Sequence, residues 1–164
     1  MFSVIFPGQG SQSIGMTKEL YDNFAYVKDL FEQADNVLGY SISKLILEGP
    51  KDELDLTENT QPAIFLASYS IFKMIQRESN INLKNAKYFA GHSLGEYSAL
   101  AAAGSLDFKS AIKLLNERGK AMQTAVPMGT GGMVAVLGVE IKEINNLLEE
   151  NQNKYRCYIA NDNS

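Results

Sequence analysis

The sequence predicts an α/β fold, and three features of its hydrophobic pattern lead to that prediction. Short apolar runs, such as Val4–Phe6, are followed by glycine-containing turns, as is typical of buried strands. Longer segments repeat their apolar residues at the three- and four-residue spacing of helices. Over residues 88–103, a strand, a sharp turn and a helix are expected to follow one another directly.

The first part of the chain is expected to form a strand, a loop and a helix. Val4–Phe6 predicts a buried strand that ends at a proline-glycine pair and continues into the glycine-rich loop 8–12. That loop lacks the spacing and the Lys-Ser/Thr of a P-loop, which disfavours phosphate binding. From Lys18 to about Leu38 the apolar spacing predicts one core-facing helix, and Gly39 is placed to end it.

The middle of the chain is expected to form, in order, a helix, a second strand and two further helices. Pro62 is expected to open an apolar helix, because proline is favoured in the first helical turn. Tyr88–Ala90 predicts the second strand, and the alanine-rich helix after it should extend to about Ala103. Asp107 is placed to cap a further helix that runs to about Thr124.

The pattern breaks at Pro127 and the glycines after it, so we expect two parts, residues 1–126 and 127–164. The second part predicts a strand, a helix and a strand over Met133–Val139, Ile141–Glu149 and Tyr155–Ala160. Such a small unit leaves an apolar sheet face and open edges, so we expect partner strands from residues outside this chain. The single cysteine, Cys157, is expected to be buried in the last strand.

Composition and charge exclude several classes of function. The 164 residues carry a formal net charge of −4 with a pI near 5.0, and no basic stripe is present that could neutralise a phosphate backbone, which excludes a nucleic-acid partner. No apolar run approaches the roughly 18 to 20 residues of a membrane span, and the start lacks the positive region of a signal peptide. A cytoplasmic protein with no membrane partner is expected.

The five residues Gly91–Gly95 match the G-x-S-x-G pattern of a nucleophile elbow, and they lie between an expected strand and an expected helix. This context favours Ser93 as a nucleophile over a chance match in a glycine turn. A helix that begins at Leu94 would direct its free N–H groups at an oxyanion. In elbow enzymes a second donor comes from a loop after an earlier strand, and loop 8–10 is of that kind.

A serine nucleophile needs a base within hydrogen-bond reach, and the chain contains a single histidine, His92. Side chains of neighbours at a sharp turn diverge, so we expect the imidazole to support the elbow and not to accept the proton of Ser93. The catalytic base is therefore expected to be missing from this sequence.

Arg118 is expected to point inward from its helix, on a face shared with Ala111, Leu114, Leu115, Ala121 and Met122. The opposite face would carry Lys113, Asn116, Glu117 and Lys120. Two interpretations of the arginine stay open. Its stem could lie along apolar surface, or its charge could be paired with an internal carboxylate. Alternatively, its planar guanidinium binds the carboxylate of a substrate through two hydrogen bonds.

Five blocks of sequence occur in the order that bacterial malonyl-CoA:acyl-carrier-protein transacylases have them, and the chain resembles that family and the acyltransferase domains of polyketide synthases. The blocks are Phe6–Gln12, Thr60–Ala63, Gly91–Leu100, Arg118-Gly119 and Ala125–Pro127. The resemblance implies transfer of a malonyl group from malonyl-CoA, a coenzyme A thioester, to the thiol of acyl carrier protein in fatty-acid biosynthesis.

The resemblance also implies roles for individual residues. Ser93 would form the acyl ester, and the backbone N–H groups of Gln9 and Leu94 would make the oxyanion hole. Arg118 would hold the malonyl carboxylate, and Gln61 would line the same site. Malonyl-CoA would be a substrate, and neither a cofactor nor a metal is implied.

For the fold, the resemblance implies a hydrolase-like parallel-sheet subdomain with the elbow, over 1–126, and the first part of a ferredoxin-like α+β subdomain, over 127–164. The family's catalytic histidine lies beyond the position that matches Ser164, so the chain alone is expected to turn over little malonyl-CoA. Two alternatives stay open: a serine esterase or thioesterase, and a catalytically silent fragment that binds carrier protein.

Overall fold

The computed structural model describes residues 1–126 and 129–163, which fall into two units, Met1–Met128 and Gly129–Ser164. The boundary expected at Pro127 stays a prediction, because residues 127 and 128 lie outside the described residues. The assignment of the two units as hydrolase-like and ferredoxin-like subdomains stays a prediction.

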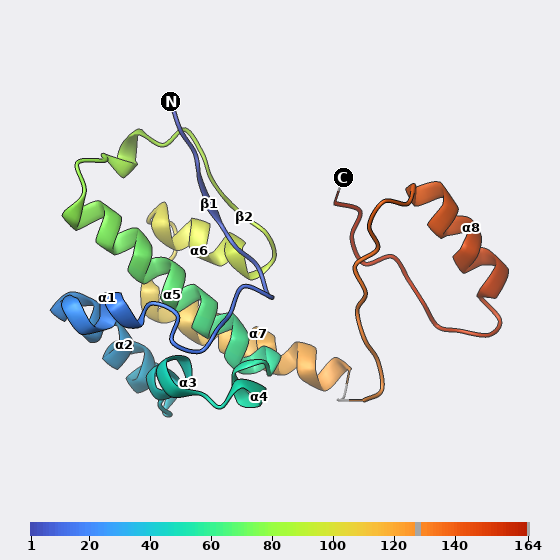
Figure 1. The fold of residues 1–164 in the computed structure, drawn as a ribbon, viewed down its shortest axis with the longest axis horizontal. Coiled ribbons are helices and arrows are strands. Elements are labelled where there is room, and N and C mark those ends of the chain that lie inside the picture. The colour runs from blue at the N-terminus through green and yellow to red at the C-terminus, as the bar shows by residue number, and fades with distance from the viewer. Residues whose placement is uncertain (127–128, 164) are drawn as a thin grey trace. The chain divides into compact units, whose positions relative to one another are not determined.

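The first unit contains a two-stranded parallel sheet, and it confirms both strands expected in this part of the chain. Strands β1 (Val4–Phe6) and β2 (Phe89–Gly91) lie side by side in Figure 1, with Phe6 paired to Gly91. Because the strands are parallel, the loops that follow them leave the sheet at the same edge. Helix α6 (Leu94–Ala102) follows β2 and packs against both strands.

Two helices stand where one was expected over Lys18–Leu38: α1 (Lys18–Asn23) and α2 (Ala25–Leu38). They are separated by Phe24, whose backbone is extended. The side chain of Asn23 donates a hydrogen bond to the carbonyl oxygen of Glu19 over 2.8 Å, and such a bond competes with continuation of the helix. Helix α2 does end at Gly39 in a left-handed conformation, as expected.

Helix α5 (Thr57–Glu78) begins five residues before Pro62, so the expectation that Pro62 opens the helix is wrong. Proline has no N–H, and the carbonyl oxygen of Glu58, four residues earlier, therefore lacks its helical donor. The side chain of Asn116 replaces that donor, with Nδ2 lying 3.1 Å from the carbonyl oxygen. A hydrogen bond from another helix thus allows the proline inside α5.

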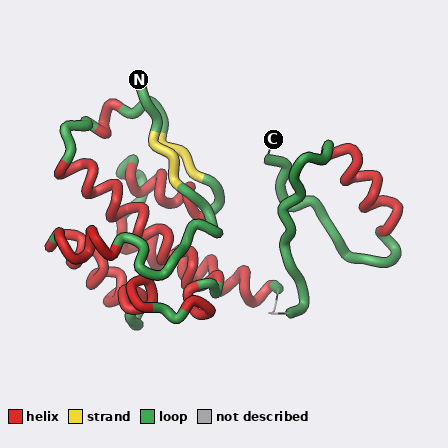
Figure 2. Tube along the Cα trace, viewed as in Figure 1, coloured by secondary structure: helices red, strands yellow, loops and turns green. Residues whose placement is uncertain are grey.

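The remaining helices of the first unit connect or cover these elements. Helix α7 (Phe108–Ala125) starts where expected, because the Asp107 carboxylate accepts a hydrogen bond from the Ser110 N–H over 3.0 Å. Two short helices, α3 and α4, and a 3₁₀ turn complete the unit at Ile42–Glu48, Lys51–Leu54 and Leu83–Asn85. The tube in Figure 2 shows that helices predominate over strands in this unit.

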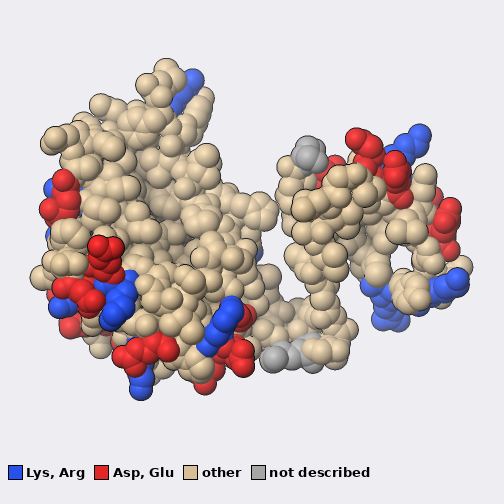
Figure 3. Space-filling model, viewed as in Figure 1, with Lys and Arg blue, Asp and Glu red and all other residues tan. Residues whose placement is uncertain are grey.

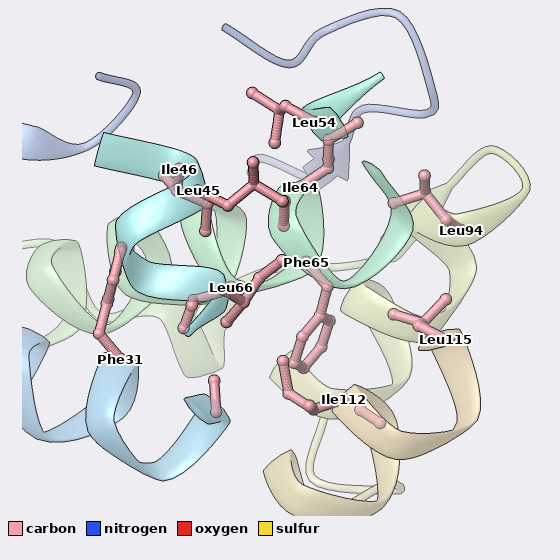
Figure 4. Close-up of a cluster of buried hydrophobic side chains, with 14 of the residues drawn as sticks. Phe31, Leu45, Ile46, Leu54, Ile64, Phe65, Leu66, Leu94, Ile112 and Leu115 are labelled. Carbon is pink, nitrogen blue, oxygen red and sulfur yellow. The ribbon is translucent and has the colours of Figure 1, made fainter. Parts of the chain in front are cut away.

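The main core lies between the helices, with buried side chains from α2 to α7. Figure 4 shows labelled side chains of this core, among them Phe31, Phe65 and Ile112, packed together. Helix α5 contributes three consecutive residues, Ile64–Leu66, each at most 2% exposed. Other fully buried side chains in this core are Phe31, Ile46, Leu54, Leu94, Ile112 and Leu115. Leu94 directly follows Ser93, so burial of its side chain, which contributes about 1.5 to 3 kcal/mol, also anchors the turn before it.

Helices α5 and α7 approach each other closely at Gly119. A Cβ atom placed there would lie 2.5 Å from the Cα of Glu58 and 2.6 Å from the carbonyl oxygen of Thr57. These are backbone atoms, which cannot move aside as a flexible side chain can. Glycine is therefore required for α7 to touch the first turn of α5.

We expect Gly119→Ala to lower the free energy of unfolding of the full-length protein. Overpacking costs about 1 to 3 kcal/mol, whereas exchanging glycine for alanine inside a helix gains about 1 kcal/mol at most, so the contact should decide the sign. Denaturant unfolding measures the difference. The same exchange at Gly132, where an added Cβ meets nothing within 4 Å, serves as the control. Equal stability of Gly119→Ala and the parent would contradict the close contact.

The second unit contains helix α8 (Ile141–Asn151), which confirms the helix expected there. The two flanking strands are wrong: over Met133–Val139 and Tyr155–Ala160 the described chain forms no strand. Leu137 and Tyr158 are 86% and 85% exposed. A strand needs neighbouring N–H and C=O groups for its ladder, and over the described residues neither segment pairs with a neighbouring strand. Cys157 is exposed for the same reason, so its expected burial is wrong as well.

The visible surface of the first unit carries both signs of charge. Figure 3 shows lysine and arginine side chains interspersed with carboxylates, and Lys51 is paired with Asp55 over 2.5 Å. Within residues 1–126 and 129–163, no helix combines the length and the apolarity needed to cross a membrane.

Candidate active site

The turn between β2 and α6 contains Ser93, and it confirms the predicted order of strand, sharp turn and helix. Ser93 has φ 56° and ψ −113°, a strained region for a residue with a side chain. A Cβ at Gly91 would lie 2.1 Å from the carbonyl carbon of Gly95, so the turn closes only because both positions lack side chains. Ser93 is half-buried at the start of the helix. That its hydroxyl opens into a cleft stays a prediction.

The glycine-rich loop after β1 lies against this elbow. A Cβ at Gly95 would lie 2.6 Å from the carbonyl oxygen of Phe6, and one at Gly8 would lie 3.1 Å from that of His92. The parallel register explains the contact, because both loops leave the sheet at the carboxyl ends of adjacent strands. The sheet therefore brings together the two segments expected to form the oxyanion hole. These are the loop that contains Gln9 and the N-terminus of helix α6, which begins at Leu94.

Side-chain hydrogen bonds also attach the glycine-rich loop to the segment around the start of α5. Gln12 accepts a hydrogen bond from the N–H of Gly10 over 2.9 Å and donates one to the Asp55 carboxylate over 2.9 Å. Gln9 Nε2 donates to Thr57 Oγ1 over 3.3 Å. The hydrogen bond from Gln12, with that from Lys51, lowers the pKa of Asp55. Nothing in the sequence pattern indicates these anchors, because Gln12 and Asp55 are separated by 43 residues and share no motif.

Arg118 joins Ser93 to Gln61. Its Nη2 donates to Ser93 Oγ over 3.0 Å, and its Nη1 donates to Gln61 Oε1 over 2.5 Å. Gln61 is fully buried, and its Nε2 in turn donates to the sulfur of Met122 over 3.3 Å. The guanidinium carbon also lies 6.0 Å from the centre of the Tyr97 ring. The three residues selected from distant parts of the sequence thus meet at one place.

The surroundings of Arg118 bear on the interpretations left open for it, and its role in binding a carboxylate stays a prediction. Its guanidinium is half-buried and hydrogen-bonded to polar side chains, so it is not simply extended along apolar surface. Within the described ranges, no ion pair joins it to a carboxylate. A charged, planar donor beside Ser93, without a carboxylate partner among the described residues, is suited to a carboxylate on a ligand.

The faces of α7 differ from those expected. Asn116 is 6% exposed, although it was expected on the polar face, and Leu114 is 44% exposed, although it was expected inside. Asn116 donates to the Tyr40 hydroxyl over 3.2 Å as well as to Glu58. An apolar pattern favours leucine for the interior, but the unpaired carbonyl oxygen created by Pro62 favours the amide.

His92 is exposed, and its carbonyl oxygen accepts a hydrogen bond from the Gly95 N–H over 2.9 Å. That the imidazole supports the elbow stays a prediction. In the part of the chain that the structure describes, no hydrogen bond joins the imidazole to Ser93. The neighbour that does bond to Ser93 is an arginine, which donates and does not accept a proton. The geometry can thus position a nucleophile and an anion binder, and the proton acceptor is a separate requirement.

A family model described as the acyl transferase domain matches residues 3–162. The chain belongs to the acyl transferase domain family. Curated relatives agree: malonyl CoA-acyl carrier protein transacylases of Haemophilus influenzae and Bacillus subtilis (strain 168) are 47% and 46% identical over 91% and 89% of this chain. The matched regions are 47% and 45% of those relatives. The chain therefore spans about half the length of the curated relatives that it matches.

Solved structures of acyl transferase family members share the fold. An acyl carrier protein S-malonyltransferase from Vibrio cholerae matches 93% of this chain and 49% of its own, with a TM-score of 0.83 and 45% identity. The enzyme of the same name from Bartonella henselae matches 99% of this chain and 52% of its own, with a TM-score of 0.86 and 41% identity. The resemblance inferred from five sequence blocks is confirmed.

Proposed function

We propose that this chain supplies the nucleophile and the carboxylate-binding group of a transferase that moves a malonyl group from malonyl-CoA to the thiol of acyl carrier protein. The single observation that carries the proposal is the 3.0 Å hydrogen bond from Arg118 Nη2 to Ser93 Oγ. A guanidinium at that distance from the nucleophile would hold a carboxylate two bonds away from the attacked carbonyl. An acyl group that ends in a carboxylate, such as malonyl, fits this spacing.

In the proposed reaction, Ser93 Oγ attacks the thioester carbonyl, the new oxygen–carbon bond forms, and the carbon–sulfur bond of the thioester breaks. Coenzyme A leaves as a thiol with the proton. The thiol of the carrier protein then attacks the malonyl ester and returns the hydroxyl to Ser93. No cofactor enters, because the thioester already carries an activated acyl group.

The backbone N–H groups of Gln9 and Leu94 are proposed to stabilise the oxyanion of each step. Two features support this assignment: the loop of Gln9 contacts the elbow, and Leu94 is the first residue of α6. The first four N–H groups of a helix have no partner inside it, and the helix dipole favours an anion at that end. Gln61 is proposed to orient the guanidinium of Arg118.

The proton acceptor for Ser93 is proposed to be a histidine outside these 164 residues. The proposal is supported by the finding that, among the described residues, no hydrogen bond joins the His92 imidazole to Ser93. The carrier protein as partner is supported by a related structure, described as a type II PKS acyl-carrier protein in complex with its malonyl-transacylase. That protein is 44% identical to this chain with a TM-score of 0.85, and the match covers 94% of this chain and 49% of the relative. The two units are proposed to be the hydrolase-like subdomain and the start of the ferredoxin-like subdomain.

The proposal is tested by giving the full-length protein malonyl-CoA and the reduced carrier-protein thiol, with p-nitrophenyl acetate in parallel. We expect malonyl carrier protein as product, a malonyl ester on Ser93 by mass spectrometry, and slow hydrolysis of the p-nitrophenyl ester. Rapid ester hydrolysis without transfer would instead favour an esterase or thioesterase. Binding of carrier protein without acylation of Ser93 would favour a catalytically silent module.

A further inference from the structure

Two hydrogen bonds from α7 hold it against α5, and both are accepted within one turn of α5. Asn116 and Arg118 are two residues apart on α7, so they project about 200° apart around its axis, with Gly119 close to Asn116. Asn116 bonds to the carbonyl oxygen of Glu58, and Arg118 bonds to the side chain of Gln61. Glu58 and Gln61 are three residues apart and belong to the same turn of α5.

The buried amide of Asn116 is well suited to fix the orientation of α7 against α5. It is 94% buried, and its Nδ2 donates both to Glu58 and, over 3.2 Å, to the Tyr40 hydroxyl. That hydroxyl donates onward to Asn59 over 3.0 Å. Burial, with smaller contributions from Glu58 and Asp35, raises the pKa of Tyr40 to about 12. The hydroxyl has one hydrogen, which it donates to Asn59, so toward Asn116 it can only accept.

We propose that Asn116 is a positioning residue for recognition of the acyl carboxylate. By bonding to the Glu58 carbonyl oxygen that Pro62 leaves free, it fixes the rotation of α7 and thereby aims Arg118 at Ser93. The inference rests on the proposed function, because it assigns Asn116 to the carboxylate-binding part of that site. Asn116 itself touches neither Ser93 nor the guanidinium; it acts through the shared turn of α5.

The test compares Asn116→Leu with the parent in the full-length protein, using malonyl-CoA and acetyl-CoA. Leucine has a similar volume but cannot donate. Misplacement of a binding group by about 1 Å costs up to about 100-fold, so we expect KM for malonyl-CoA to rise about tenfold, with kcat/KM for acetyl-CoA changed less than about twofold. The control is Glu117→Gln, a change at an exposed position of the same helix. It should leave the kinetic constants for both substrates unchanged.

The double variant Asn116→Leu, Pro62→Ala provides a rescue that a general loss of stability would not. Alanine at position 62 restores a backbone N–H four residues after Glu58, and this N–H can take over the free carbonyl oxygen. We expect the double variant to recover most of the malonyl selectivity. Equal losses for both substrates in Asn116→Leu, or no recovery in the double variant, would overturn the inference.

A crystal structure of the Asn116→Leu protein separates failure of this inference from failure of the proposed function. We expect Arg118 Nη2 to have moved out of hydrogen-bond distance of Ser93 Oγ and to return in the double variant. An unchanged Arg118–Ser93 hydrogen bond would overturn the positioning role, whatever the substrate. If the parent protein transfers no malonyl group, the proposed function fails, and the geometry of the two variants still decides whether Asn116 aims the arginine.

Discussion

Ser93→Ala in the full-length protein is expected to lower the rate of malonyl transfer by about 10⁴- to 10⁶-fold, as loss of a serine nucleophile does in triad enzymes. The backbone at position 93 has φ 56°, and alanine differs from serine there only by the hydroxyl, so the turn should be retained. Steady-state transfer to the carrier-protein thiol measures the rate, and mass spectrometry measures loss of the acyl ester.

A matched control is Ser105→Ala, an exposed serine shortly after the end of α6. It should leave transfer unchanged. Retention of more than about one per cent of the rate in Ser93→Ala would show that the acyl group does not pass through this hydroxyl, because a missing nucleophile costs far more than that.

Arg118→Ala should discriminate against malonyl-CoA relative to acetyl-CoA. Removing one partner of a charge-assisted, bidentate pair costs about 2 to 5 kcal/mol, which corresponds to roughly 30- to 5,000-fold in kcat/KM for malonyl-CoA. Acetyl-CoA has no carboxylate and should lose much less. Arg118→Lys should recover only part of the difference, because lysine keeps the charge and lacks the planar pair of donors.

The control for Arg118→Ala is Lys113→Ala, since Lys113 is an exposed cation on the same helix. Similar losses with both acyl-CoA substrates would mean that the arginine supports the elbow, through its bond to Ser93, and does not bind the carboxylate.

Most of the first unit could be predicted because the relevant signals are local. The strand at Val4–Phe6, the elbow at Ser93 and the helix capped by Asp107 depend on residues a few positions apart. The errors occur where distant residues decide. Pro62 was expected to open a helix, and its place inside α5 depends on a donor from α7. A proline inside a helix leaves the carbonyl oxygen four residues before it without a helical donor, and this could have been expected from the sequence. Which residue would supply the missing donor could not be predicted from nearby residues.

In the second unit, too, structure that depends on distant partners differs from what the local sequence predicts. The apolar alternation at Met133–Val139 predicts a strand, and the described chain forms none, because a strand is stable only when a neighbour completes its hydrogen-bond ladder. Helix α8 forms as predicted, since its backbone hydrogen bonds lie within one segment. Propensity alone therefore predicted the helix of this unit correctly and its strands wrongly.

By itself, the sequence determined the local strand, turn and helix that contain Ser93, and it supplied the candidate residues for the chemistry. It also determined the family, through five ordered blocks. The tertiary structure decided that Arg118, Gln61 and Ser93 meet, and that Asn116 turns inward while Leu114 stays exposed. The physical reason is that a glycine turn is specified by backbone sterics within five residues. The partner of a buried donor or acceptor is specified only when helices far apart in the chain pack together.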